Sequence, residues 1–236
     1  LASTTEALYA TARPLYRKYF GGAQLSPQAE KLAAQLPDRH GERAALIKRV
    51  FDKLAEKQAN DDTVVPRSKE LVQLATEFVR AKNFVTVPDA PLKVIVLPEF
   101  QRGVAVAYCQ PPGALEPNGE TFFAVSPTPK DWTEARRTSF FREYNDYMLH
   151  DLTVHEAMPG HYLQLAHANK FKAPTLIRAI WFSGTFVEGW ACYTELLMAD
   201  AGFGGPEVKM QQLKMRLRAI INAMIDQKVH MGGMTQ

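Results

Sequence analysis

The stretch DLTVHEAMPGHYLQL, residues 151–165, decides how the rest of the sequence is interpreted. It resembles the zinc-protease signature H-E-x-x-H, in which two histidines lie one helical turn apart and a glutamate follows the first. Here the second histidine comes two residues late, because His155 and Glu156 are followed by four residues before His161. The stretch is therefore either a metal site with two extra residues or a helix that happens to hold histidines.

The spacing of the two histidines excludes an unbroken helix as a metal-binding element. Residues at i and i+4 are about 40° apart around a helix, whereas residues at i and i+6 are about 120° from alignment. Pro159 and Gly160 lie between the histidines, where proline disrupts a helix and glycine tolerates unusual backbone angles. A bulge there predicts that His161 returns to the face of His155. A plain helix end at Pro159-Gly160 is the alternative.

A third ligand is expected from a neighbouring element, because catalytic zinc takes three protein ligands and leaves one position open. The stretch GTFVEGWACYTELL, residues 184–197, places Glu188 in an otherwise apolar helix. A buried carboxylate needs a partner, and a metal ion is one such partner. Pairing of Glu188 with Arg178 or Arg218 is the structural alternative. Glu195 is a second candidate ligand or a residue that supports one.

Composition excludes several classes of protein. The chain has 236 residues, of which 46% are hydrophobic and 22% charged, as in ordinary globular proteins. The net charge of +3 is spread along the chain, which argues against nucleic-acid binding. No apolar run reaches the length of a membrane span. The chain begins with Leu1 and is interpreted as a C-terminal piece of a longer protein, so localisation and oligomeric state stay open.

The pattern of hydrophobic residues predicts a mainly α-helical fold with a small antiparallel β-sheet, an α+β class. A helical part over 1–90 and a catalytic part over 91–236 are expected within one continuous domain. The expected strands are 92–100, 103–110 and 121–127. The expected helices are 5–20, 41–58, 66–83, 132–143, 146–170, 175–200 and 206–230.

Three segments carry a resemblance to a known family. HEAMPGHYLQ, FVEGWACYTELL and LRAIINAMIDQKVHMGG resemble, in order and spacing, the motifs of the bacterial domain-of-unknown-function 885 family. The resemblance covers about residues 90–236. It implies a gluzincin-like zinc peptidase with a helical architecture and a small sheet beside the metal helix. The family usually has a glycine shortly after the aspartate of the last motif, where this chain reads DQKVH.

This resemblance and the spacing together assign roles. His155, His161 and Glu188 are expected to bind Zn²⁺, which makes water acidic enough to react at neutral pH. Glu156, beside a ligand without being one, is the expected general base. The oxyanion of the transition state needs a further donor, for which Tyr193, Arg218 and His230 are the candidates.

Arg218, Asn222, Asp226 and His230 follow one another at steps of four in the last helix, opposite an apolar side that includes Leu213 and Met224. Such a column is either a solvated face or a lining of the active-site cleft. In the second case Asp226 orients His230, and Arg218 binds a substrate carboxylate or the oxyanion. The family motif covers Arg218, Asp226 and His230 but not Asn222.

The function expected from these features is that of a zinc-dependent peptidase acting on peptides or small proteins. A free edge of the strand at 103–110 or 121–127 would bind an extended substrate through backbone hydrogen bonds. Two alternatives remain. One is a zinc hydrolase of a non-peptide amide or ester, and the other is a catalytically inactive helical binding protein. The intact Glu156 argues against the last.

Overall fold

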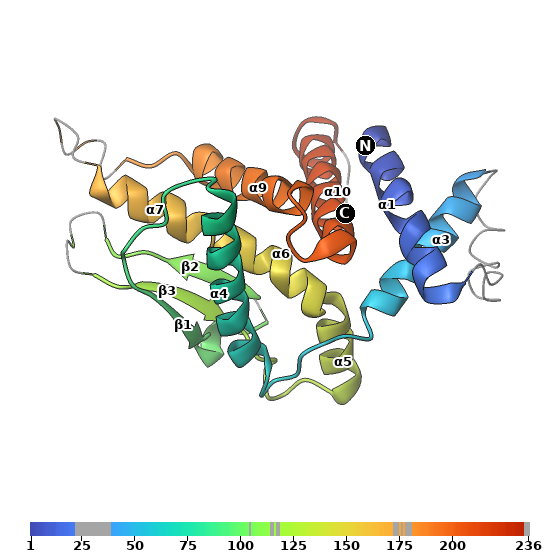
Figure 1. The fold of residues 1–236 in the computed structure, drawn as a ribbon, viewed down its shortest axis with the longest axis horizontal. Helices are drawn as coiled ribbons and strands as arrows, with labels where there is room; N and C mark the ends of the chain where they lie inside the picture. The colour runs from blue at the N-terminus through green and yellow to red at the C-terminus, as the bar shows by residue number, and fades with distance from the viewer. Residues whose placement is uncertain are drawn as a thin grey trace. The chain divides into compact units, whose positions relative to one another are not determined.

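The computed structural model describes residues 1–21, 39–103, 105–113, 116, 119–171, 175, 177 and 181–233. The chain divides into two compact units (Figure 1). Unit 1 joins Leu1–Glu56 to Gly204–Gln236, and unit 2 is Lys57–Phe203. These units do not coincide with the 1–90 and 91–236 parts expected from the sequence.

Unit 1 is built from three helices, α1 (Ala2–Phe20), α3 (Arg39–Leu54) and α10 (Gly205–Met231). Helix α1 contacts both of the others. Leu8, Ala12 and Leu15 of α1 are buried. The carboxylate of Glu207, in the first turn of α10, accepts hydrogen bonds from Lys18 and Tyr19 of α1. These contacts join the first and last helices of the chain.

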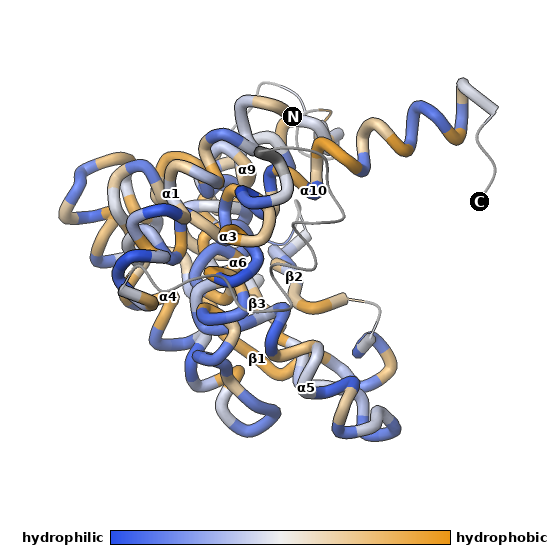
Figure 2. Tube along the Cα trace, turned by 90° about the vertical axis from the view of Figure 1, so that its right-hand side faces the viewer, coloured by the Kyte–Doolittle hydropathy of each residue, from blue (hydrophilic) through white to orange (hydrophobic). Residues whose placement is uncertain are grey.

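The two halves of α10 differ in burial. Leu213 in the first half is 2% exposed, but Ile221 and Met224 in the second half are 41% and 45% exposed. Figure 2 shows hydrophobic and hydrophilic stretches alternating along this second half up to the C-terminus. The apolar side expected for this helix is therefore buried only over its first turns.

The sheet of unit 2 has three strands, β1 (Leu92–Val96), β2 (Ala107–Gln110) and β3 (Thr121–Val125), in the order β1-β3-β2. Strand β3 is antiparallel to β2 but parallel to β1. The α+β class is thus confirmed, whereas the expectation of a wholly antiparallel sheet is wrong. An alternating hydrophobic pattern marks a strand without fixing its direction, and here β3 inserts between the two strands that precede it.

The helices of unit 2 surround α6 (Asp146–Glu156), which contacts α4 (Val64–Lys82), α7 (His161–Lys170), α9 (Gly184–Asp200) and strand β2. Helix α5 (Glu134–Glu143) precedes it, and a short 3-10 helix, η1 (Glu99–Gln101), follows β1. One helix was expected over 146–170, but the chain forms two. Among the helices in the described ranges, none has the length and apolar character needed to cross a membrane.

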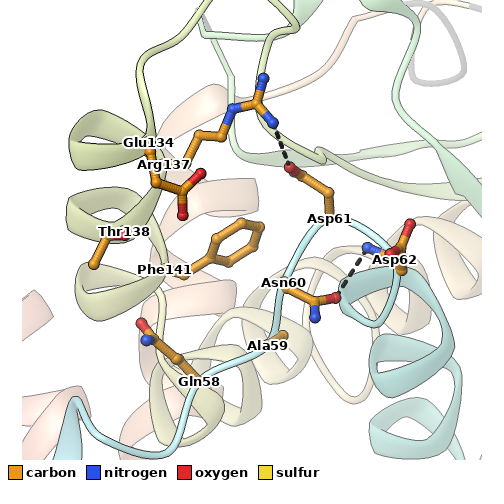
Figure 3. Close-up of a pocket in the computed structure, with 9 residues that line it drawn as sticks. All are labelled: Gln58, Ala59, Asn60, Asp61, Asp62, Glu134, Arg137, Thr138 and Phe141. Atoms are coloured by element: carbon orange, nitrogen blue, oxygen red, sulfur yellow. Dashed lines mark hydrogen bonds and ion pairs between the residues drawn. The ribbon is translucent and has the colours of Figure 1, made fainter.

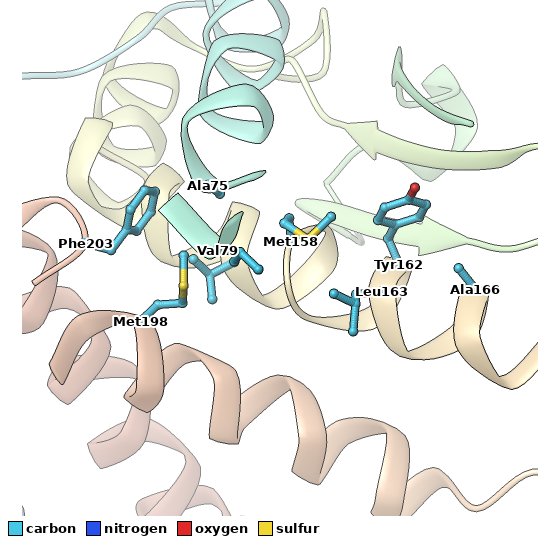
Figure 4. Packing of buried hydrophobic residues seen from close by; sticks show 9 residues of the cluster. Ala75, Val79, Met158, Tyr162, Leu163, Ala166, Met198 and Phe203 are labelled. Atoms are coloured by element: carbon cyan, nitrogen blue, oxygen red, sulfur yellow. The ribbon is translucent and has the colours of Figure 1, made fainter. Parts of the chain in front are cut away.

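A hydrophobic cluster holds α4, the 157–160 segment, α7 and α9 together (Figure 4). Ala75 and Val79 of α4 belong to the same buried cluster as Met158 of that segment and Met198 of α9. All four side chains are at most 2% exposed. Since burying each large apolar side chain is worth about 1.5–3 kcal/mol, this packing fixes the segment that separates the two histidines.

The start of α6 is fixed by polar contacts. The side chain of Asn145 accepts hydrogen bonds from the first backbone N–H groups of the helix. The Asp146 carboxylate forms ion pairs with two cations, with Oδ1 2.6 Å from Arg67 Nε and Oδ2 2.9 Å from Lys57 Nζ. Burial acts to raise the pKa of Asp146, but these two cations more than offset it, so the pKa lies below its ordinary value. Helix α6 is thereby anchored at the end opposite to His155.

Candidate metal centre

The helix that carries His155 stops and restarts before His161. Helix α6 ends at Glu156, and α7 begins at His161 itself. Between them the backbone N–H of Gly160 donates to the carbonyl of Val154 at 2.9 Å, so the connecting segment folds back onto the last turn of α6. The Met158–Pro159 peptide bond is cis. A bulge within one continuous helix was expected, and the observed break places the two histidines side by side in another way.

The break brings together the three residues expected to bind metal. The ring centroids of His155 and His161 are 4.7 Å apart. Glu188 of α9 faces both rings, with Oε2 at 3.5 Å from His155 Nε2 and Oε1 at 3.7 Å from His161 Nε2. The three residues each offer a donor atom within 4.8 Å of the other two.

These separations fit a metal centre better than a hydrogen-bonded cluster. At 3.5 and 3.7 Å the carboxylate oxygens are too far from the ring nitrogens for good hydrogen bonds. Tetrahedral ligands held about 2.0–2.1 Å from zinc lie roughly 3.3–3.5 Å from one another. Two imidazoles and one carboxylate are also a donor set that zinc accepts in catalytic sites. The residues present therefore fit the ion that the sequence implies.

Glu195 orients the first histidine. Its buried carboxylate lies 2.6 Å from His155 Nδ1, which leaves Nε2 turned toward Glu188. A carboxylate in this position fixes the ring and its tautomer, as is usual behind metal-binding histidines. Burial acts to lower the pKa of His155, but the hydrogen bond and charge of Glu195 outweigh it and raise the pKa above its ordinary value. Of its two predicted roles, Glu195 fits the supporting one.

Glu156 is held beside the cluster by the sheet. Its Oε2 accepts a hydrogen bond from the backbone N–H of Cys109 in strand β2 at 3.0 Å. Burial raises the pKa of Glu156, while the nearby His155 and this hydrogen bond partly oppose the shift. The carboxyl group is therefore easier to protonate than an exposed glutamate, which suits a group that must accept a proton and release it again.

A tryptophan of α9 is hydrogen-bonded to the 157–160 segment that connects α6 to α7. Trp190 Nε1 donates to the carbonyl of Pro159 at 2.8 Å. We expect Trp190→Phe to lower zinc affinity about tenfold or more, because removing a residue that supports metal ligands costs about 10–100-fold. The measurement is a zinc titration against a chelator of known affinity.

Trp181→Phe is the matched control for this variant. The Trp181 side chain is 81% exposed, so its replacement is expected to leave zinc affinity at the wild-type value. Equal affinities in the two variants would contradict a positioning role for the Trp190 indole.

The other predicted site residues lie outside this cluster of donors. Tyr193 is 53% exposed on α9, with its ring 6.1 Å from that of Trp190. Arg218 and His230 belong to α10 in unit 1, where His230 Nε2 lies 3.4 Å from Asp226 Oδ1 and both side chains are exposed. Their oxyanion roles stay predictions. Arg178, named as a possible partner of Glu188, lies outside the described residues.

Two cysteines near the site were not expected from the sequence. Cys109 supplies the N–H that holds Glu156, and no sequence pattern predicts this because it depends on how β2 docks against α6. Cys192 lies near His155 and Glu195. Helical spacing could have identified Cys192, since it follows Glu188 by four residues and precedes Glu195 by three.

A separate cavity of about 270 Å³ lies between α5 and the segment before α4 (Figure 3). Asp61, one of its three acidic residues, accepts a hydrogen bond from the backbone N–H of Thr128 at 2.6 Å and lies 3.7 Å from Arg137. None of the cavity residues belongs to the metal cluster. They are Gln58, Ala59, Asn60, Asp61, Asp62, Glu134, Arg137, Thr138 and Phe141.

Two bacterial proteins are among the solved structures of similar fold. The first, described as "a putative lipoprotein of unknown function" from Shewanella oneidensis, is 31% identical with a TM-score of 0.79. It is matched over 99% of this chain and 39% of its own. The second, "the putative lipoprotein from Colwellia psychrerythraea", is 20% identical with a TM-score of 0.67, over 93% of this chain and 39% of its own. This chain thus spans about two fifths of each.

Among curated proteins no match is found. A family model described as "Bacterial protein of unknown function (DUF885)" matches residues 22–236, which include the His155, His161 and Glu188 segments. This match agrees with the resemblance carried by the three motifs. The chain belongs to the DUF885 family.

Proposed function

We propose that this chain carries the catalytic centre of a zinc-dependent peptidase. The observation that carries the proposal is the convergence of His155, His161 and Glu188, whose donor atoms lie within 4.8 Å of one another. Glu156 is adjacent but outside this set, and it is buried and held in place by Cys109. Three protein ligands with a neighbouring carboxylate that does not bind the metal are the usual composition of a zinc peptidase site.

The roles of the residues follow from their positions. Bound zinc would supply a Lewis acid that makes water reactive at neutral pH. Glu156 accepts a proton from the attacking water and passes it to the leaving amine. Glu195 keeps His155 in one tautomer through the 2.6 Å contact with Nδ1. Tyr193 of α9 stays a candidate for the oxyanion donor, and the same role for Arg218 and His230 stays an expectation from the sequence.

Strand β2 is the element best suited to bind an extended peptide. It lies at an edge of the sheet, and its Cys109 N–H reaches the general base. Strand β3, the other strand suggested by the sequence, is central and has neighbours on both sides, so it offers no free edge. A peptide added along β2 would form backbone hydrogen bonds that depend little on its sequence. The substrate class proposed is therefore peptides or small proteins.

Metal analysis and peptide digestion test this proposal together. The purified protein is expected to contain one zinc ion per chain, and His161→Ala is expected to lower zinc affinity by about 100-fold or more. A peptide library incubated with the zinc-loaded protein is expected to show cleavage that a chelator abolishes. His167→Ala is the matched control, since His167 is a half-buried histidine of α7 that bonds the Thr86 carbonyl and belongs to neither set of metal donors.

The outcomes separate the proposed function from its alternatives. Zinc binding with hydrolysis of esters or other amides, and none of peptides, would replace the peptidase by another zinc hydrolase. Absence of zinc binding in the wild-type protein would overturn the proposed metal centre itself.

A further inference from the structure

A second set of three metal-binding side chains overlaps the first. His155, Cys192 and Glu195 each offer a donor atom within 4.8 Å of the other two. We propose that this set binds a thiophilic divalent cation, such as Cd²⁺, in competition with the His155–His161–Glu188 set. The two sets share His155, and they differ because only the second contains sulfur.

The geometry of α9 creates this second set. Glu188, Cys192 and Glu195 follow at steps of four and three residues, so they form one column along the helix. The His155 ring lies beside this column, with Nε2 3.5 Å from Glu188 and Nδ1 2.6 Å from Glu195. Each ring nitrogen therefore faces a different candidate set.

A cation bound in the second set would replace a proton. The 2.6 Å contact between His155 Nδ1 and Glu195 Oε1 is a hydrogen bond, so a cation that binds both atoms displaces its proton and moves the two atoms further apart. The thiol of Cys192 loses its own proton on coordination, as metal-bound thiols do. The thiol proton passes to water and the Nδ1 proton moves to Nε2, while bonds to Nδ1, Sγ and the carboxylate form, and no oxidant or reductant is required.

The two sets cannot use His155 at the same time. A neutral imidazole has one nitrogen with a free lone pair, and the other nitrogen carries a proton. When Nδ1 binds a cation, the proton moves to Nε2, which no longer serves the set that contains His161. Occupation of the second set therefore removes one ligand from the first.

Ion type decides which set is favoured. Thiolate ligands favour soft cations, whereas imidazole and carboxylate suit zinc well. Cys192 is an exposed residue of α9. Glu195 is 6% exposed and supplies a buried negative charge that favours a cation beside it. Cadmium is therefore expected to select the second set.

Cadmium titration of the metal-free protein tests this inference without any activity assay. The wild type is expected to show an ultraviolet thiolate-to-cadmium charge-transfer band that saturates at one ion per chain. Cys192→Ser is expected to lose the band and about 100-fold in cadmium affinity. Cys109→Ser removes the other of the two cysteines and is expected to keep the band. A wild type without the band, or a Cys192→Ser variant that retains it, overturns the proposal.

A further variant shows whether the two sets are distinct. Glu188 belongs only to the first set, so Glu188→Gln is expected to keep the cadmium band unchanged. Loss of the band in Glu188→Gln would mean that the cation lies across both sets, and competition between them would be disproved.

Inhibition of hydrolysis is a consequence that rests on the proposed peptidase function. Cadmium is expected to inhibit the zinc-loaded wild type, and Cys192→Ser is expected to need about 100-fold more cadmium for half inhibition, each relative to its own uninhibited rate. Equal sensitivity of the two proteins would contradict inhibition through Cys192. Absence of zinc-dependent hydrolysis in every variant would refute the proposed function, while the charge-transfer band would still decide the second set.

Discussion

Glu156→Gln is expected to abolish hydrolysis while zinc stays bound. Glutamine has the size of glutamate, and its carbonyl oxygen can still accept the hydrogen bond from Cys109 N–H. It cannot accept a proton from water, so the general base is lost, which costs about 10²–10⁴-fold in turnover. Because Glu156 is not one of the three converging residues, the zinc content is expected to equal that of the wild type.

Two measurements on the same preparation check this prediction, namely the turnover number with a cleaved peptide and the zinc content per chain. Glu77→Gln, at an exposed position of α4, is the control for the loss of one carboxylate. More than a few per cent of wild-type activity in Glu156→Gln would exclude Glu156 as the general base. Loss of zinc would instead mean that Glu156 helps to hold the metal centre.

The sequence was sufficient to single out the three residues that the structure brings together, because two of them lie in one short motif. His155, Glu156 and His161 lie within seven residues, and Glu188 was identified as a carboxylate in an apolar helix. The burial expected for Glu188 is wrong, because its side chain is 65% exposed. Their convergence depends on packing, since α9 must contact both α6 and α7 for Glu188 to face the two rings. From the sequence, only the resemblance to the family motifs indicated that the Glu188 segment belongs to the same site as the two histidines.

Other features depend on information that periodicity does not carry. The direction of β1 relative to β3 is set by the path of the chain, so an alternating pattern could not distinguish a mixed sheet from an antiparallel one. The hydrogen bond from Cys109 to Glu156 uses a backbone group, to which the identity of the side chain gives no clue. His230 belongs to unit 1, whereas the metal cluster belongs to unit 2. Its role as an oxyanion donor remains a prediction.

The break between α6 and α7 was predicted in position but not in form. Pro159 and Gly160 were correctly identified as the point of interruption, but a bulge keeps one helix whereas the chain begins a new one at His161. The difference follows from tertiary contacts. Met158 is buried in the core and the Pro159 carbonyl is bonded by Trp190, so neighbouring elements hold the segment in a turn.

Gly160→Ala is expected to destroy the metal centre, because the turn leaves no room for a Cβ atom. A Cβ at this position would lie 1.9 Å from the carbonyl oxygen of His155 and 2.3 Å from that of Val154. Both are backbone atoms of α6, so relief requires the 157–160 segment to move away from the helix end. Overpacking that forces such a backbone shift costs about 3 kcal/mol. Since His161 directly follows this glycine, the shift also displaces a metal ligand, and zinc affinity is expected to fall by about 100-fold or more.

Gly189→Ala is the matched control for Gly160→Ala, because the two variants add the same methyl group near the same site. Nothing lies within 4 Å of a Cβ built at Gly189, inside helix α9. Alanine is favoured over glycine within a helix by about 0.5–1 kcal/mol, so Gly189→Ala is expected to keep zinc affinity and to unfold at a slightly higher temperature. Gly160→Ala is expected to unfold at a lower temperature than the wild type, and added zinc is expected to stabilise it less. If Gly160→Ala binds zinc and unfolds like the wild type, the close approach of Gly160 to the end of α6 does not position His161.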